Sequence, residues 1–140
     1  MRSKGPNTTI WLEPAVLDRP FRIQFRDDHI HVTLGDQFRL TPDIYREYWA
    51  SLSEIAEKHN CRRVLVEGVA PRGEHSTNQI IEAGIRTSAI PDLWMAYCLR
   101  DHEKNDGSEL YQAIASSQST HIKFFVDRDQ ALDWLKANSK

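Results

Sequence analysis

The residues best placed to do chemistry form the stretch Glu74-His75-Ser76-Thr77, which combines a carboxylate, an imidazole and two hydroxyls. Ser76 and Gln79 have the S-x-x-Q spacing of a capping box, which predicts that a helix begins directly after Ser76. A hydroxyl at a helix start can also carry a phosphate, because the helix dipole and the free amides there favour added negative charge. Structural cap and phosphorylation site are therefore compatible interpretations of Ser76.

Two alternating segments near the N-terminus predict an antiparallel hairpin. Residues 21–25 and 30–34 each place apolar side chains on one face, with Asp27-Asp28 between them as the turn and a solvated outer face. Thr41-Pro42 then predicts a helix start, with Thr41 as the cap and Pro42 at the first helical position. This helix is expected to end near His59, where Asn60 tolerates the left-handed conformation.

Continuous apolar runs at 64–66, 93–99 and 122–126 predict strands covered on both faces. The helical patterns between them, at 77–88 and 108–117, are long enough to connect parallel strands. A last helix is expected from Asp127, with Gln130 at capping-box spacing. The predicted fold is α/β, a mixed sheet with an N-terminal antiparallel hairpin followed by parallel βα units and helices packed on the sheet. The predicted organisation is a tail at 1–20 and a single domain at 21–140.

In such a sheet, ligands and partners meet the loops beyond the carboxyl ends of the strands. Three loops qualify, and they carry the following ionisable residues: Arg72, Glu74, His75, Arg100, Asp101, His102 and Asp127. The alternative is that these are ordinary solvated loops. A hydrolase or isomerase at this edge would need a pocket that contains Glu67, Glu74 or His75 with perturbed protonation.

The composition and charge of the sequence argue against several classes of function. The net charge of -2, without a basic cluster, argues against nucleic acid as a partner. No run approaches the ~18 apolar residues of a membrane span, and no secretory signal is visible, so a cytoplasmic location is expected. Cys61 and Cys98 have no metal-ligand spacing and are expected to be reduced. His29 and His31 share a strand face but lack a third ligand, so neither metal nor cofactor is expected. No common catalytic motif is present.

Several of these segments also resemble the STAS or SpoIIAA-like group of anti-sigma-factor antagonists. The likeness covers about residues 21–135 and rests on the hairpin, the helix at 45–49, the strand at 64–68, the serine-threonine helix start and the ending at 129–135. It implies a SpoIIAA-like fold and a non-enzymatic regulatory domain that binds a protein partner, a kinase or another regulator. It also implies a switch by phosphorylation at Ser76 or Thr77, with Glu74 near the acidic residue that usually precedes the acceptor.

Two further expectations stay open. A neighbouring branch of the same superfamily resembles lipid-carrying CRAL-TRIO domains, so a carrier of a small apolar ligand is the alternative function. A homodimer is the other expectation, because an edge strand of the hairpin could pair with a second copy.

Overall fold

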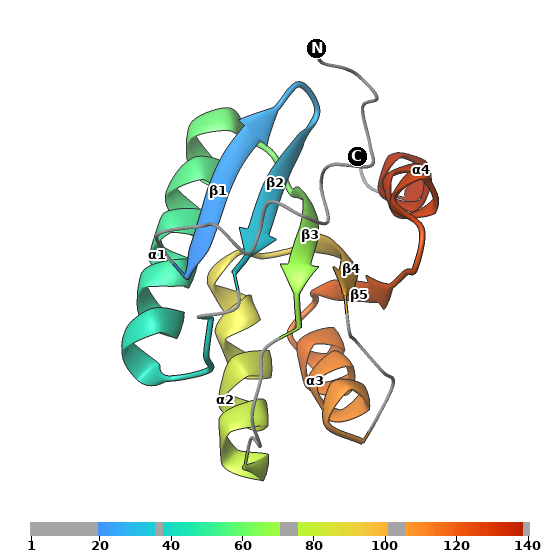
Figure 1. The fold of residues 1–140 in the computed structure, drawn as a ribbon. Coiled ribbons are helices and arrows are strands. Elements are labelled where there is room, and N and C mark those ends of the chain that lie inside the picture. The colour runs from blue at the N-terminus through green and yellow to red at the C-terminus, as the bar shows by residue number, and fades with distance from the viewer. Residues whose placement is uncertain (1–19, 36–37, 71–75, 101–105, 139–140) are drawn as a thin grey trace.

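The computed structural model describes residues 20–35, 38–70, 76–100 and 106–138. Figure 1 shows a sheet with helices packed against it. Five strands and four α-helices alternate in this order: β1 Phe21–Arg26, β2 His29–Leu34, α1 Pro42–His59, β3 Arg63–Val69, α2 Thr77–Arg86, β4 Trp94–Arg100, α3 Asp106–Ser117, β5 His121–Phe124 and α4 Arg128–Asn138. A short 3-10 helix, Thr87–Ala89, follows α2. The predicted fold class is confirmed.

The sheet has the strand order β1-β2-β3-β4-β5. β1 is antiparallel to β2, and each later pair is parallel. The hairpin register runs from Phe21 opposite Leu34 to Arg26 opposite His29, which leaves Asp27 and Asp28 as the turn, as predicted. Asp27 has a φ of 48°, a left-handed conformation that aspartate tolerates better than most residues.

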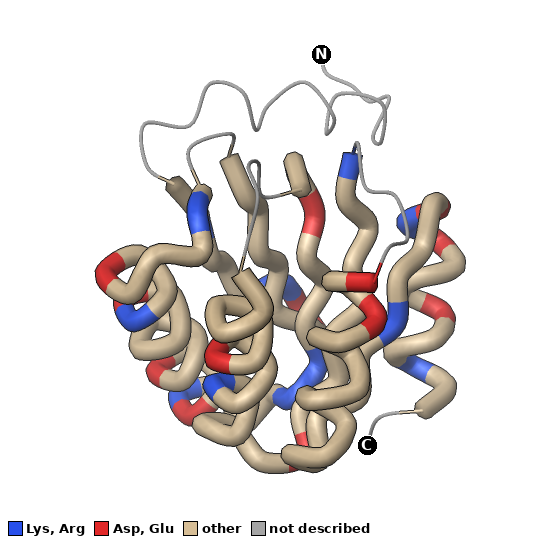
Figure 2. Tube along the Cα trace, turned by 90° about the horizontal axis from the view of Figure 1, so that it is seen from below, with Lys and Arg blue, Asp and Glu red and all other residues tan. Residues whose placement is uncertain are grey.

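Successive side chains of β3 and β4 point to opposite faces of the sheet, so their apolar residues contribute to two separate cores. Val64, Val66 and Met95 belong to the larger core, to which α1, α2 and α3 contribute. Leu65 and Ala96 point the other way and belong to a smaller core with α4. Figures 1 and 2 show α1, α2 and α3 side by side along one face and α4 apart from them. The sheet is thus covered unequally, by three helices on one face and one on the other.

The ends of α1 match the sequence except at one cap. Pro42 occupies the first turn, and Asn60 ends the helix with φ and ψ of 49°, as predicted. Thr41 has the extended backbone of an N-cap, and its carbonyl oxygen accepts a hydrogen bond from Tyr45 N. Its side chain makes no capping hydrogen bond, so the predicted hydroxyl cap is wrong.

The predicted solvated outer face holds for β1 but not for β2. On β1, burial alternates between buried or half-buried and exposed positions. On β2, every residue after His29 is buried, and these include the outward-facing His31 and Thr33. The reason is that β2 is paired on both sides and that His31 hydrogen-bonds to Glu67 of β3.

Helix and strand bounds shift by a few residues elsewhere. The helix predicted at 77–88 ends at Arg86 before the 3-10 turn, and the one predicted from 108 begins at Asp106. Asp127 Oδ1 accepts from Asp129 N at 2.9 Å and so satisfies a free amide at the start of α4. Within the described ranges, every helix is too short or too polar to cross a membrane.

Candidate functional site

The predicted capping box at the start of α2 is confirmed. Ser76 Oγ accepts a hydrogen bond from Gln79 N at 3.1 Å, and Gln79 Oε1 accepts one from Ser76 N at 2.8 Å. Gln79 Nε2 also donates to Leu40 O at 3.4 Å, which ties the turn to the segment before α1. Ser76, Thr77 and Asn78 are exposed. The hydroxyl is therefore part of a fixed turn and still open to a modifying enzyme.

The charges along α2 leave room for an anion at its start. Its first turn holds no acidic residue, whereas those of α1, α3 and α4 hold Asp43, Asp106 and Asp129. Acidic residues near a helix N-terminus stabilise it through the helix dipole. In the described part of α2, no carboxylate supplies that stabilisation. A negative charge added at Ser76 would lie at the helix N-terminus, where the dipole favours it, and the described first turn of α2 holds no carboxylate that would repel it.

Substitutions at Ser76 can separate its capping role from its charge. Ser76→Ala removes the acceptor of the Gln79 amide, and we expect the free energy of unfolding to fall by about 1 kcal/mol. Ser76→Asn and Ser76→Asp retain a capping oxygen and should stay within a few tenths of a kcal/mol of the parent. Urea unfolding of the three variants measures this. Equal losses in all three would show that the hydroxyl does not cap the helix.

The other residues predicted at this edge fall into two groups. Those outside the described residues are Arg72, Glu74, His75, Asp101 and His102. Of the rest, Arg100 is the last residue of β4, and Asp127 directly precedes α4. Glu67 lies near the carboxyl end of β3 and points to the α4 side of the sheet rather than toward α2. The structure thus connects Glu67 and α4, but not Glu67 and Ser76.

Glu67 anchors a buried polar cluster that joins three elements. Its side chain is 1% exposed, and its Oε1 atom accepts from His31 Nε2 at 2.6 Å and from Arg128 Nη2 at 3.1 Å. Because the ionised carboxylate only accepts, Nε2 of a neutral His31 must carry the proton. Cys98 is the register partner of Glu67 on β4 and is 1% exposed. A carboxylate, an imidazole, a guanidinium and a thiol therefore meet beneath the start of α4.

Burial sets the protonation of two members of this Glu67 cluster. It lowers the pKa of His31 below its ordinary value, although the hydrogen bond to Glu67 opposes this shift. Burial, together with the carboxylates of Glu67 and Asp127, raises the pKa of the Cys98 thiol to about 11. At neutral pH His31 is therefore uncharged and Cys98 is a thiol, which is a poor nucleophile. In this closed arrangement the cluster is suited to holding α4 rather than to covalent catalysis.

The sequence pattern pointed to only part of this cluster. Glu67 was a candidate for acid–base chemistry, but the outward face of His31 was expected to be solvated and is 4% exposed instead. The sequence did contain a signal for the pairing of His31 with Glu67. It is a carboxylate within an apolar strand together with a histidine on another strand, because buried ionisable groups are seldom left unpaired. In the described part of the chain, no three His, Cys, Asp or Glu residues are arranged to hold a metal ion.

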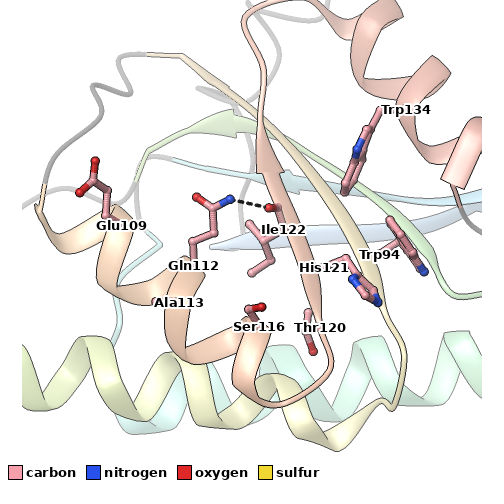
Figure 3. A pocket seen from close by; sticks show the side chains of 9 residues that line it. All are labelled: Trp94, Glu109, Gln112, Ala113, Ser116, Thr120, His121, Ile122 and Trp134. Carbon is pink, nitrogen blue, oxygen red and sulfur yellow. Dashed lines mark hydrogen bonds between the residues drawn. The ribbon is translucent and has the colours of Figure 1, made fainter.

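A separate groove lies along β5, between α3 and α4 (Figure 3). Its volume is about 520 Å³, and it is lined by Trp94, Glu109, Gln112, Ala113, Ser116, Thr120, His121, Ile122 and Trp134. The His121 ring stacks on Trp94 with 3.9 Å between centroids. Gln112 Nε2 donates to Ile122 O at 2.7 Å and so occupies a carbonyl of the edge strand. None of the sequence-predicted site residues lines this groove.

Comparison with known proteins gives little further guidance. No protein-family model matches the chain, and no curated protein matches it. A solved structure, that of the Mtb enoyl-CoA isomerase in its apo form, superposes with a TM-score of 0.45 at 12% sequence identity. The match covers 59% of this chain and 42% of that protein. A likeness of this size supports neither a family nor an activity.

Proposed function

We propose that this chain is a non-enzymatic, cytoplasmic regulatory domain of the STAS or SpoIIAA type that binds a protein partner at the start of α2. Phosphorylation of Ser76, or of Thr77 beside it, would switch that binding. The observation that carries the proposal is the exposed capping box, because it presents a hydroxyl in a fixed conformation at a helix N-terminus. The order of the elements and the strand order β1 to β5 are consistent with the resemblance.

The charge distribution supports a protein partner rather than nucleic acid. In Figure 2, Lys and Arg positions are interspersed with Asp and Glu positions along the described helices. Among the described residues of this turn, the exposed Ser76, Thr77 and Asn78 carry no charge before modification. A phosphate adds a charge of about -1.5 to -2 at neutral pH, which is large on such a surface. The switch would then act through the charge itself, without a change of fold.

Site-specific photocrosslinking in the native cells tests the contact. A photoreactive side chain at Asn78, which is exposed in the first turn of α2, should crosslink to one protein partner. The matched control is the same group at Lys136, which is exposed in the last turn of α4. Partner crosslinks from both positions in equal yield, or from neither, would contradict binding at the start of α2.

Mapping of phosphopeptides from the same cells tests the switch. We expect phosphate on Ser76 or Thr77 and a lower crosslinking yield from Asn78 in Ser76→Asp than in Ser76→Asn. Both variants keep the helix cap, so they differ mainly in charge. Absence of phosphate, with equal yields from the two variants, would contradict the switch while leaving partner binding intact.

The alternative of a small apolar-ligand carrier predicts a different result. Organic extraction of the purified protein followed by mass spectrometry would reveal a bound lipid or apolar molecule. On the side of α1, α2 and α3, the core is filled by side chains that include packed aromatic rings of Phe21, Phe38, Tyr45 and Tyr48. A stoichiometric ligand in the extract would favour the carrier over the regulatory domain.

A further inference from the structure

The cluster around Glu67 joins the start of α4 to the centre of the sheet. Arg128 is the first residue of α4, and its side chain is 21% exposed, while Glu67 is 1% exposed. His31, from β2, bonds the same carboxylate oxygen as Arg128. Beneath α4, Leu65, Ala96 and Cys98 pack against Ala131 and Leu135. Release of Arg128 would therefore free the first turn of α4 and uncover this part of the sheet.

Several polar atoms of the cluster lack a hydrogen-bond partner. They are His31 Nδ1, Glu67 Oε2 and Arg128 Nε, all buried. The first of these matters most, because a second proton on His31 must go to Nδ1, and no acceptor faces it in the described part of the chain. A buried donor without an acceptor destabilises the folded arrangement. The closed arrangement therefore favours neutral His31 on geometric grounds alone.

Charge balance leads to the same conclusion. With neutral His31, the buried charges of Glu67 and Arg128 cancel. The charged groups that act on His31 are Glu67 of β3, Arg26 of β1 and Arg128 of α4. When His31 takes up a proton, it becomes a second buried cation that is repelled by Arg128 and by Arg26. Protonated His31 and Arg128 then share a single oxygen atom of the Glu67 carboxylate. Arg128 is the partner that can leave, because it is partly exposed at the start of a helix.

We propose that His31, Glu67 and Arg128 form an acid-operated latch, which holds the start of α4 on the sheet at neutral pH and releases it when His31 takes up a proton. Burial lowers the pKa of His31, so the closed form loses stability as the pH falls below the unfolded value of about 6.5. Glu67, Asp127 and Arg128 also act on the thiol beneath α4. Release uncovers Cys98, which the closed form buries.

Cys98 provides the readout of the latch. In a Cys61→Ser background it is the sole cysteine of the chain, since the sequence contains two. We expect to measure the rate at which Cys98 reacts with 4,4′-dithiodipyridine and to divide it by the rate for the urea-unfolded chain at the same pH. This normalised rate should rise by up to about tenfold per pH unit below pH 6.5. In His31→Gln, whose amide does not titrate, the normalised rate should be independent of pH. In Arg128→Gln it should be fast at both pH 7.5 and pH 5.5.

Two controls distinguish local release from general unfolding. Cys61, read in a Cys98→Ser background, lies after α1 and hydrogen-bonds to backbone carbonyls of residues 28 and 63, so its rate should not follow the latch. Local release should also be insensitive to low concentrations of urea, because little surface is exposed. A pH-independent Cys98 rate in the parent would overturn the proposal. The proposal would also be overturned if acid accelerated the reaction of Cys98 in His31→Gln, or the reaction of Cys61, as much as it accelerates the reaction of Cys98 in the parent.

Discussion

Gly68→Ala is expected to lower the free energy of unfolding by about 4 kcal/mol, a large share of the stability of a chain of this size. Gly68 has a φ of 113°, a conformation that L side chains rarely adopt. A β-carbon there would also collide with the backbone nitrogen and carbonyl oxygen of Leu34, its register partner on β2. Strand backbone cannot yield as a side chain can, so the β2–β3 pairing is disturbed. Urea unfolding followed by circular dichroism measures the loss.

Gly84→Ala is the matched control for that substitution. Gly84 lies within α2, and an added β-carbon would approach Ile114 Cγ2 of α3 at 2.5 Å. Ile114 Cβ is also close, at 2.6 Å, so α3 must move slightly on α2. Unlike Gly68, however, Gly84 does not have a positive φ, and alanine is the better helix former by about 1 kcal/mol. We therefore expect a loss below half of that for Gly68→Ala. An equal or smaller loss for Gly68→Ala would contradict the close β2–β3 approach.

Glu67→Ala should cost about 3–5 kcal/mol in the free energy of unfolding, because it leaves Arg128 and His31 without their shared acceptor. In the double variant with Arg128→Ala, the loss should be smaller than the sum of the two single losses. Denaturation of the four proteins in the cycle gives the coupling energy. Exactly additive losses would show that the buried pair does not hold α4.

The exposed pair of Asp43 and Arg46 on α1 is the control cycle. Its atoms are 3.9 Å apart, and its side chains are 96% and 65% exposed. Solvent screening removes most of such an attraction, so its coupling energy should be indistinguishable from zero. A coupling comparable to that of Glu67 and Arg128 would mean that burial is not the source of the effect.

Features that depend on local sequence patterns were predicted correctly, whereas features that depend on long-range contacts were not. The spacing of Ser76 and Gln79 is enough to predict the cap, because both of its hydrogen bonds close within one helical turn. The burial of His31 depends on Glu67, which is 36 residues away, and alternation within a strand cannot report what covers its outer face. The close approach of Gly68 to Leu34 is likewise a property of the assembled sheet.

The candidate site shows the same difference between local and long-range features. The sequence located α2 and its exposed hydroxyls but grouped Glu67 with them, because the predicted strand ended at residue 66, whereas β3 extends to Val69 and contains Glu67. Strand alternation separates them, since Glu67 points to the α4 face. The prediction that Glu74 and His75 contribute to partner binding concerns residues outside the described ranges and stays a prediction.

The most direct test of the proposed switch at the start of α2 is the affinity of the protein crosslinked from Asn78 for Ser76→Asn and Ser76→Asp. Both variants keep the cap, so any difference in affinity comes from the charge. The account predicts binding to Ser76→Asn as tight as to the parent. It predicts at least tenfold weaker binding to Ser76→Asp, about 1.4 kcal/mol, because an unpaired charge must be desolvated at the contact. Equal affinities for the two variants would contradict the switch.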